Sequence, residues 1–69
     1  MDQFAVQKLA YQITLTYFNR GYGMELGTRN AVADVLGLAP WMTPWEAGKM
    51  VDRAWAALEK QADSMRMRK

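Results

Sequence analysis

The sequence contains no cysteine and no histidine. Disulfides, thiolate nucleophiles, Cys/His zinc sites and Ser-His triads are therefore excluded, and the usual neutral-pH general base is missing. Chains below about 70 to 80 residues usually need disulfides, a metal or a partner chain for stability. This chain has 69 residues and lacks both cysteine and the usual metal ligands, so we expect it to associate with another chain.

Long apolar runs are also missing. None approaches the ~20 residues that a membrane-spanning helix needs. The first residues, Met1, Asp2 and Gln3, carry neither the basic nor the apolar part of a secretory signal. We therefore expect a cytoplasmic protein without membrane contact.

Positive and negative charges are nearly balanced once the C-terminal end is set aside. Nine basic residues against seven acidic ones give a net charge of +2. Without Arg66, Arg68 and Lys69 the balance is six against seven, or −1. Because duplex DNA is bound by basic side chains arrayed over a folded face, this distribution disfavours nucleic acid as a partner. Residues 66–69 are predicted to be a solvated basic tail.

Residues 2–19 are expected to form a long helix with two apolar stripes. Asp2 is a candidate N-cap, and Gly21 or Gly23 can take the left-handed conformation that ends a helix. β-Branched and aromatic residues at 12–18 leave a strand as the less favoured alternative. The first stripe comprises Val6, Leu9, Ala10, Ile13 and Tyr17, and the second comprises Phe4, Tyr11, Leu15 and Phe18.

A helix that is apolar on two sides must be covered on both. In so short a chain a second copy can supply the cover. The second stripe therefore predicts a homodimer interface, and Trp55 is expected either to be structural or to join that dimer contact.

Two further helices are predicted. The middle one, over 28–37, is short and has Gly37 as its C-cap. The last one, over 44–65, begins with the capping box of Thr43 and Glu46, with Pro44 at its first position. We therefore predict one all-α domain over 1–69, with two long helices and one short helix, assembled as a homodimer. The apolar face of the last helix comprises Ala47, Met50, Val51, Ala54, Leu58, Ala62 and Met65.

Trp41 and Trp45 lie in and just after a turn that is stiffened by two prolines. Tryptophan dominates measured interface hot spots, and a stiff turn loses little conformational freedom on binding. The alternative is that both indoles fill a small core. It is weaker for Trp45, whose helical phase differs from that of the apolar face. Partner binding is therefore predicted at Trp45 first, and then at Trp41, Met42 and Tyr22.

Catalysis is not expected. Nothing in the spacing of Asp34, Glu46 and Asp52 brings them together in a dry pocket, as acid-base chemistry requires. The glycines between 21 and 27 lack the lysine and Ser/Thr of a phosphate loop. No cofactor or metal site is predicted.

A helix-turn-helix regulator of transcription is the main alternative. Ala33 and Gly37 have the spacing that such motifs show before the turn, and the next helix would then enter a major groove. The connection 38–43, however, is long for this motif and contains a proline. The next helix also starts with Trp45 and Glu46, where base-reading Arg, Lys, Asn or Gln would be expected. A structural or assembly subunit of a phage particle is a third hypothesis.

The size, the absence of Cys and His, the two-sided first helix and the tryptophan turn together resemble the small inhibitors of temperate phages. More narrowly, the chain is similar to the anti-quorum-sensing proteins of Mu-like Pseudomonas phages. The resemblance covers the whole chain in length and layout. It implies a dimer in the cytoplasm of the infected host that blocks DNA binding by the LuxR-type activator LasR. It also implies inhibition of the type IV pilus ATPase PilB, with Trp45, Trp41 and Met42 as partner-binding residues.

Overall fold

A computed structural model describes residues 2–67, with side chains as far as residue 65, and contains three α-helices. α1 spans Gln3–Asn19, α2 spans Met24–Leu38 and α3 spans Pro44–Met67. No strand occurs in this range, so the predicted all-α class is confirmed, and the strand alternative for 12–18 is wrong. The side chains of the predicted basic tail, 66–69, fall outside the described part.

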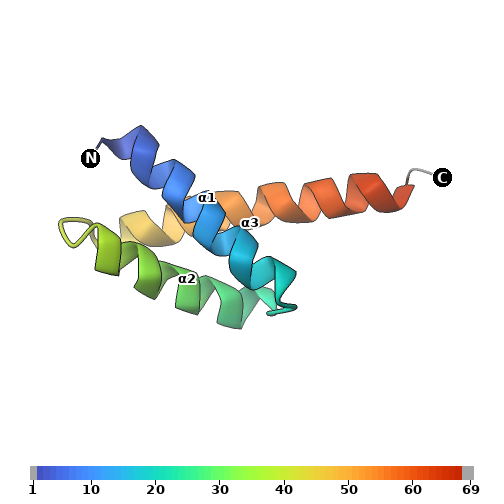
Figure 1. Ribbon diagram of the computed structural model, residues 1–69, viewed down its shortest axis with the longest axis horizontal. Coiled ribbons are helices and arrows are strands. Elements are labelled where there is room, and N and C mark those ends of the chain that lie inside the picture. The colour runs from blue at the N-terminus through green and yellow to red at the C-terminus, as the bar shows by residue number, and fades with distance from the viewer. Residues whose placement is uncertain (1, 68–69) are drawn as a thin grey trace.

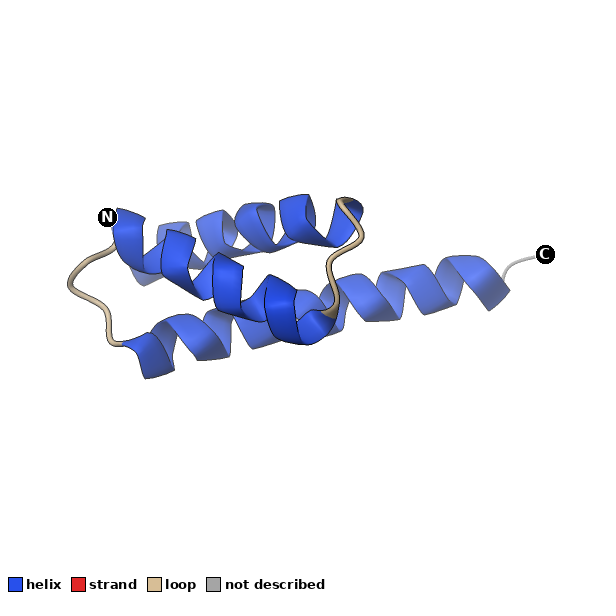
Figure 2. Ribbon diagram, turned by 90° about the horizontal axis from the view of Figure 1, so that it is seen from below, coloured by secondary structure: helices blue, strands red, loops and turns tan. Residues whose placement is uncertain are grey.

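Each helix packs against the other two. The loops that join the helices lie at opposite ends of the bundle (Figure 2). The N-terminus of α1 lies at the same end as the loop between α2 and α3, while the C-terminal part of α3 extends beyond the other two helices (Figure 1). The chain therefore has a three-helix body at one end and a single projecting helix at the other.

The helix ends follow the local signals in the sequence. The Asp2 carboxylate accepts a hydrogen bond from the Ala5 amide at 2.8 Å, which caps α1. Gly21 has a φ of +84° and provides the left-handed residue after α1. At α3, the Thr43 hydroxyl accepts from the Glu46 amide at 3.1 Å, and the Thr43 amide donates to the Glu46 carboxylate at 3.1 Å. The predicted capping box is confirmed.

The second helix differs from its predicted bounds. It begins at Met24 rather than at residue 28, and it ends at Leu38, so Gly37 lies inside the helix and Ala39 is the C-cap. The three helices have 17, 15 and 24 residues, so the second is only slightly shorter than the first. Gly27 reads as a helix breaker in sequence, but in the structure it is a buried residue of α2.

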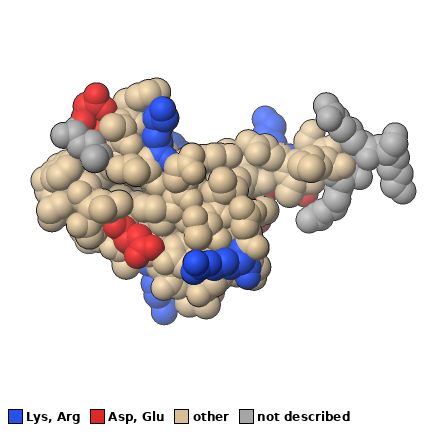
Figure 3. Space-filling view, viewed as in Figure 1, with Lys and Arg blue, Asp and Glu red and all other residues tan. Residues whose placement is uncertain are grey.

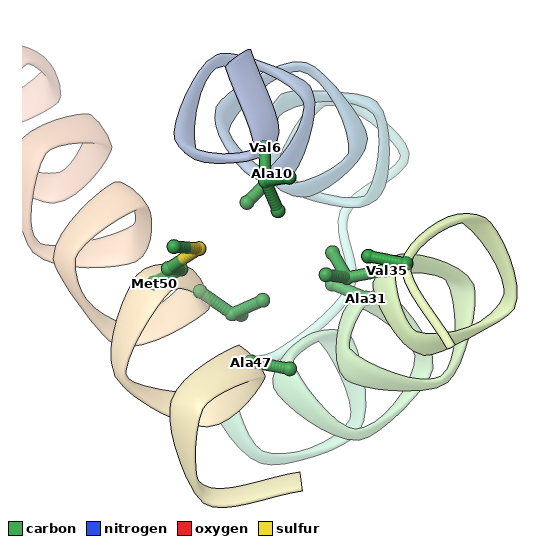
Figure 4. Packing of buried hydrophobic residues seen from close by; sticks show 8 residues of the cluster. Val6, Ala10, Ala31, Val35, Ala47 and Met50 are labelled. Carbon is green, nitrogen blue, oxygen red and sulfur yellow. The ribbon is translucent and has the colours of Figure 1, made fainter. Parts of the chain in front are cut away.

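The core lies between the three helices and is built mainly from small side chains. In Figure 4, Val6 and Ala10 of α1, Ala31 and Val35 of α2, and Ala47 and Met50 of α3 point toward one another. Buried Thr14 satisfies its hydroxyl by donating to the Ala10 carbonyl at 2.6 Å. The first predicted stripe of α1 therefore faces the core.

Trp55 joins all three helices at one contact. Its indole, on α3, is 4% exposed. It lies edge-to-face with Phe18 of α1, with a centroid distance of 5.7 Å. It also covers Gly27 of α2 so closely that a Cβ there would lie 2.6 Å from Cζ3. Only glycine fits under this ring, which explains why α2 contains a buried glycine.

The close contact between Gly27 and Trp55 makes a stability prediction. Gly27→Ala is expected to destabilise the fold by about 1–3 kcal/mol, because a methyl group must enter a filled space. Gly48→Ala is the matched control, since nothing lies within 4 Å of its added Cβ. The free energy of unfolding of the control should rise by about 0.5–1 kcal/mol, because alanine loses less backbone entropy than glycine when a helix forms. Urea unfolding followed by circular dichroism measures both, and equal effects would contradict the packing of Trp55 on Gly27.

Candidate partner-binding surface

Trp41, Met42 and Trp45 form one corner of the molecule, which we call the aromatic corner. Trp41 lies in the loop before α3 and is 60% exposed, while Trp45 is the second residue of α3 and is 69% exposed. Met42 is half-buried and packs against the core. The aromatic corner therefore combines two indoles open to solvent with a side chain that anchors the loop, and the expectation of an outward Trp45 is confirmed.

The surroundings of Trp45 hold it on a rigid base. The capping box fixes the first turn of α3, and the Lys49 Nζ lies 4.3 Å from the centroid of a Trp45 ring. Two shallow pockets of about 200 and 140 Å³ adjoin the indoles of Trp41 and Trp45. Gln3 lines both pockets, so the first turn of α1 belongs to the same surface.

Tyr22 lies apart from the aromatic corner, so it does not extend that surface. It lies in the loop before α2, whereas Trp41 lies in the loop after α2. A helix of 15 residues separates the two loops by about 22 Å. Tyr22 instead packs edge-to-face on Tyr17, with a centroid distance of 5.0 Å.

Tyr17 links α1 to α2 beside Tyr22. Its hydroxyl donates to the Asp34 carboxylate at 2.6 Å. This hydrogen bond raises the pKa of Tyr17 above its usual value, because it favours the protonated hydroxyl and because Asp34 repels a phenolate. The contribution of this hydrogen bond to the free energy of unfolding is present at neutral pH. It is lost only as the pH rises through the raised pKa of Tyr17. This contact serves the fold and adds nothing to the aromatic corner.

The second stripe of α1 is only partly covered within one chain. Phe4 is 74% exposed, and Tyr11, Leu15 and Phe18 are half-buried. Trp55 is different, because the contacts with Gly27 and Phe18 bury it inside the chain. Of the two roles expected for Trp55, its burial within one chain matches the structural one, with 4% of the residue exposed.

Sequence reasoning missed a groove between α1 and α3. This groove has a volume of about 450 Å³, with Lys8 and Tyr11 on the α1 side and Arg53, Ala54 and Ala57 on the α3 side. Among the described residues, neither Lys8 nor Arg53 forms a hydrogen bond or an ion pair. The only signal in sequence was small residues at positions 54 and 57 beside an arginine, and this pattern is too common to predict a groove.

Charged side chains do not form a continuous basic surface on the face shown in Figure 3, where uncharged residues separate the Lys and Arg groups. Within residues 2–65, no three acidic side chains gather as a metal site would require. No helix in the described part is long and apolar enough to cross a bilayer. The described part thus contains an aromatic corner next to an α1–α3 groove, with Arg53 lining both the groove and the pocket beside Trp45.

The chain matches no family model, and neither a curated protein nor a solved structure is significantly similar to it. Its function is therefore inferred from its own residues and from the surface that they form.

The exposure of the indoles predicts their response to a quencher. In a Trp41→Phe, Trp45→Phe double variant, Trp55 is the remaining indole, and acrylamide should quench its fluorescence several-fold less than it quenches the wild-type chain. The physical reason is that the quencher must contact the ring, and Trp55 is 4% exposed. Circular dichroism checks that the double variant is folded. Equal quenching in the two proteins would show that the indole of Trp55 is open to solvent.

Proposed function

We propose that this protein is a non-catalytic inhibitor that acts by stoichiometric binding through the aromatic corner. The observation that supports the proposal is the exposure of two indoles, 60% and 69%, on a turn whose backbone is fixed by prolines and by a capping box. Rigid, solvent-exposed tryptophans lose little entropy when a partner covers them, and tryptophan is enriched in interface hot spots. Such a surface is suited to binding another protein.

Inhibition requires no catalytic group, because it is enough to cover a surface that must otherwise meet DNA or a sister subunit. A standard interface buries about 800 Å² on each partner. The chain has an accessible surface of 5055 Å², so an interface of this size uses only one side of the molecule. The aromatic corner with the neighbouring first turn of α1 lies on one side.

The proposed target is a bacterial quorum-sensing activator of the LuxR type, represented by LasR, and the proposed effect is loss of its DNA binding. A second proposed target is the pilus assembly ATPase PilB. Both follow from the resemblance to the anti-quorum-sensing proteins of Mu-like Pseudomonas phages, which rests on chain length, helical layout and the tryptophan turn. The site of action would be the cytoplasm of the infected host.

Trp45→Ala tests the aromatic corner. We expect it to weaken capture of purified LasR by about 2 kcal/mol or more, roughly 30-fold, because an indole at the centre of an interface is a typical hot spot. Leu26→Ala is the control, since Leu26 is also an exposed apolar residue but lies on the first turn of α2, at the other end of the bundle. Calorimetric titration measures affinity, and circular dichroism checks the fold. Unchanged affinity in Trp45→Ala would remove Trp45 from the binding site.

The homodimer also remains a proposal. We propose that a second copy covers the second stripe of α1, where Phe4 is 74% exposed and Tyr11, Leu15 and Phe18 are only half-buried. Pairing two such stripes about a twofold axis buries apolar surface on both copies. We leave Trp55 out of the proposed interface, because it is only 4% exposed within one chain.

Light scattering during gel filtration should then give about twice the chain mass of 7.9 kDa. Phe4→Glu and Leu15→Glu should each give a monomer, because a carboxylate would have to be buried between the copies. Met65→Glu is the control, since Met65 is 73% exposed and lies near the C-terminal end of α3. A wild-type monomer at micromolar concentration would contradict the dimer, as would a dimer that both glutamates leave intact.

The DNA-binding regulator is the less supported alternative. α2 and α3 are separated by residues 39–43, a longer connection than the usual turn of this motif. The first turn of α3 presents Trp45 and Glu46, and the Glu46 carboxylate already accepts from Thr43. These side chains do not offer the donors that read bases in a major groove.

A further inference from the structure

The groove between α1 and α3 has apolar walls and positive charge at its edges. Tyr11, Ala54 and Ala57 supply apolar surface, and Lys8 and Arg53 lie on opposite sides of about 450 Å³ of open space. The uncharged polar side chains of Gln7 and Gln12 complete the lining on α1. No carboxylate lines this groove. The Tyr11 hydroxyl already accepts from the Gln61 amide at 3.3 Å, which holds the ring in place.

Lys8 and Arg53 are both exposed and, in the described part of the chain, have no hydrogen-bonding or ionic partner. Two cations that face each other across a groove repel each other, and an anion placed between them relieves that repulsion. Lys49 precedes Arg53 by one helical turn and adds a third positive charge on the same side of α3. Asp52, the residue directly before Arg53, carries a negative charge. The groove is therefore complementary to an apolar surface that carries negative charge at its margins.

Two helices with alanines between them form a groove that fits a third helix. Small side chains at positions 54 and 57 allow close approach, as in the helix-in-groove mode of recognition. The apolar stripe of an incoming helix would lie on Tyr11 and Ala57, above the buried Ala54, and its flanks would meet Lys8 and Arg53. A single loop or an isolated anion would leave most of the apolar wall uncovered.

We propose that this groove binds an acidic amphipathic helix of the partner protein, with carboxylates at Lys8 and Arg53. The inference rests on the proposed function in one respect, that the occupant belongs to a partner protein. A second copy centred on the groove is disfavoured, because twofold symmetry would bring the same basic side chains together.

The test uses two synthetic helical peptides of about 15 residues, near the length at which isolated helices become stable. Both have leucine on one face. One carries glutamate on its flanks, and the other carries lysine at the same positions. We expect the glutamate peptide to bind the wild-type chain and the lysine peptide to bind at least tenfold more weakly. Fluorescence anisotropy of a labelled peptide measures the dissociation constants. Raising the salt concentration should weaken the binding of the glutamate peptide.

Charge-reversal variants locate the binding. Lys8→Glu and Arg53→Glu should each lower the affinity for the glutamate peptide about tenfold. Arg29→Glu makes the same change of charge on the exposed side of α2 and should bind like the wild type. Trp45→Ala should also bind the glutamate peptide with the affinity of the wild type, because Trp45 does not line the groove. If Trp45→Ala left the affinity for LasR unchanged, this would count against the aromatic corner alone. The two proposals can therefore fail separately.

Three outcomes would overturn the groove proposal. The first is equal binding of both peptides, and the second is no binding of either. The third is a homodimer that Lys8→Glu or Arg53→Glu converts to monomer, since the occupant of the groove would then be a second copy. Circular dichroism of every variant ensures that a loss of binding is not a loss of fold.

Discussion

The packing of Trp55 on Gly27 is the contact on which the arrangement of the helices depends. It is the point where a large ring of α3 meets both other helices, with Phe18 of α1 against its edge. Because the ring fits only over a residue without a side chain, it sets the rotation of α3 about its own axis. Arg53 is two residues earlier, about 200° around that axis, and is therefore exposed at the α1–α3 groove.

A core of small residues leaves large ones outside. Ala10, Ala31 and Ala47 are fully buried and let the helices approach closely, but they leave no space for further indoles. Trp41 and Trp45 are consequently exposed. If a partner covers roughly 100 Å² of each ring, the gain is about 2–3 kcal/mol per ring before the cost of association. The same small core that makes the fold compact thus supplies its most favourable binding surface.

Sequence alone predicted what depends on neighbours along the chain. Examples are the Asp2 cap, the capping box of Thr43 and Glu46, and the outward phase of Trp45, which involve residues within one or two turns. A left-handed glycine after the first helix was also predicted, at Gly21 or Gly23, and the structure has it at Gly21. The first stripe of α1 and the apolar face of α3 from Ala47 to Leu58 likewise follow from their helical period. Met65 was predicted on the same face and is 73% exposed, so that part of the prediction is wrong.

What could not be predicted depends on residues far apart in the chain. The middle helix was predicted to start at residue 28, whereas α2 starts at Met24 and includes Gly27. The contact that accommodates this glycine comes from Trp55, 28 positions later. The separation of Tyr22 from Trp41 follows from the true length of α2. The groove depends on how α1 crosses α3, because this crossing brings Lys8 opposite Arg53. No local pattern contains that information.

The two proposed interfaces share Tyr11, which belongs both to the second stripe of α1 and to the wall of the groove. A second copy that covers this ring narrows the space for a partner helix, and a bound helix removes part of the surface that the second copy needs. The two equilibria are therefore linked, and each weakens the other by the same factor. Under this constraint, an inhibitor stored as a dimer would bind its target as a monomer or through the part of the surface away from Tyr11. The aromatic corner, which Tyr11 does not line, would serve both states.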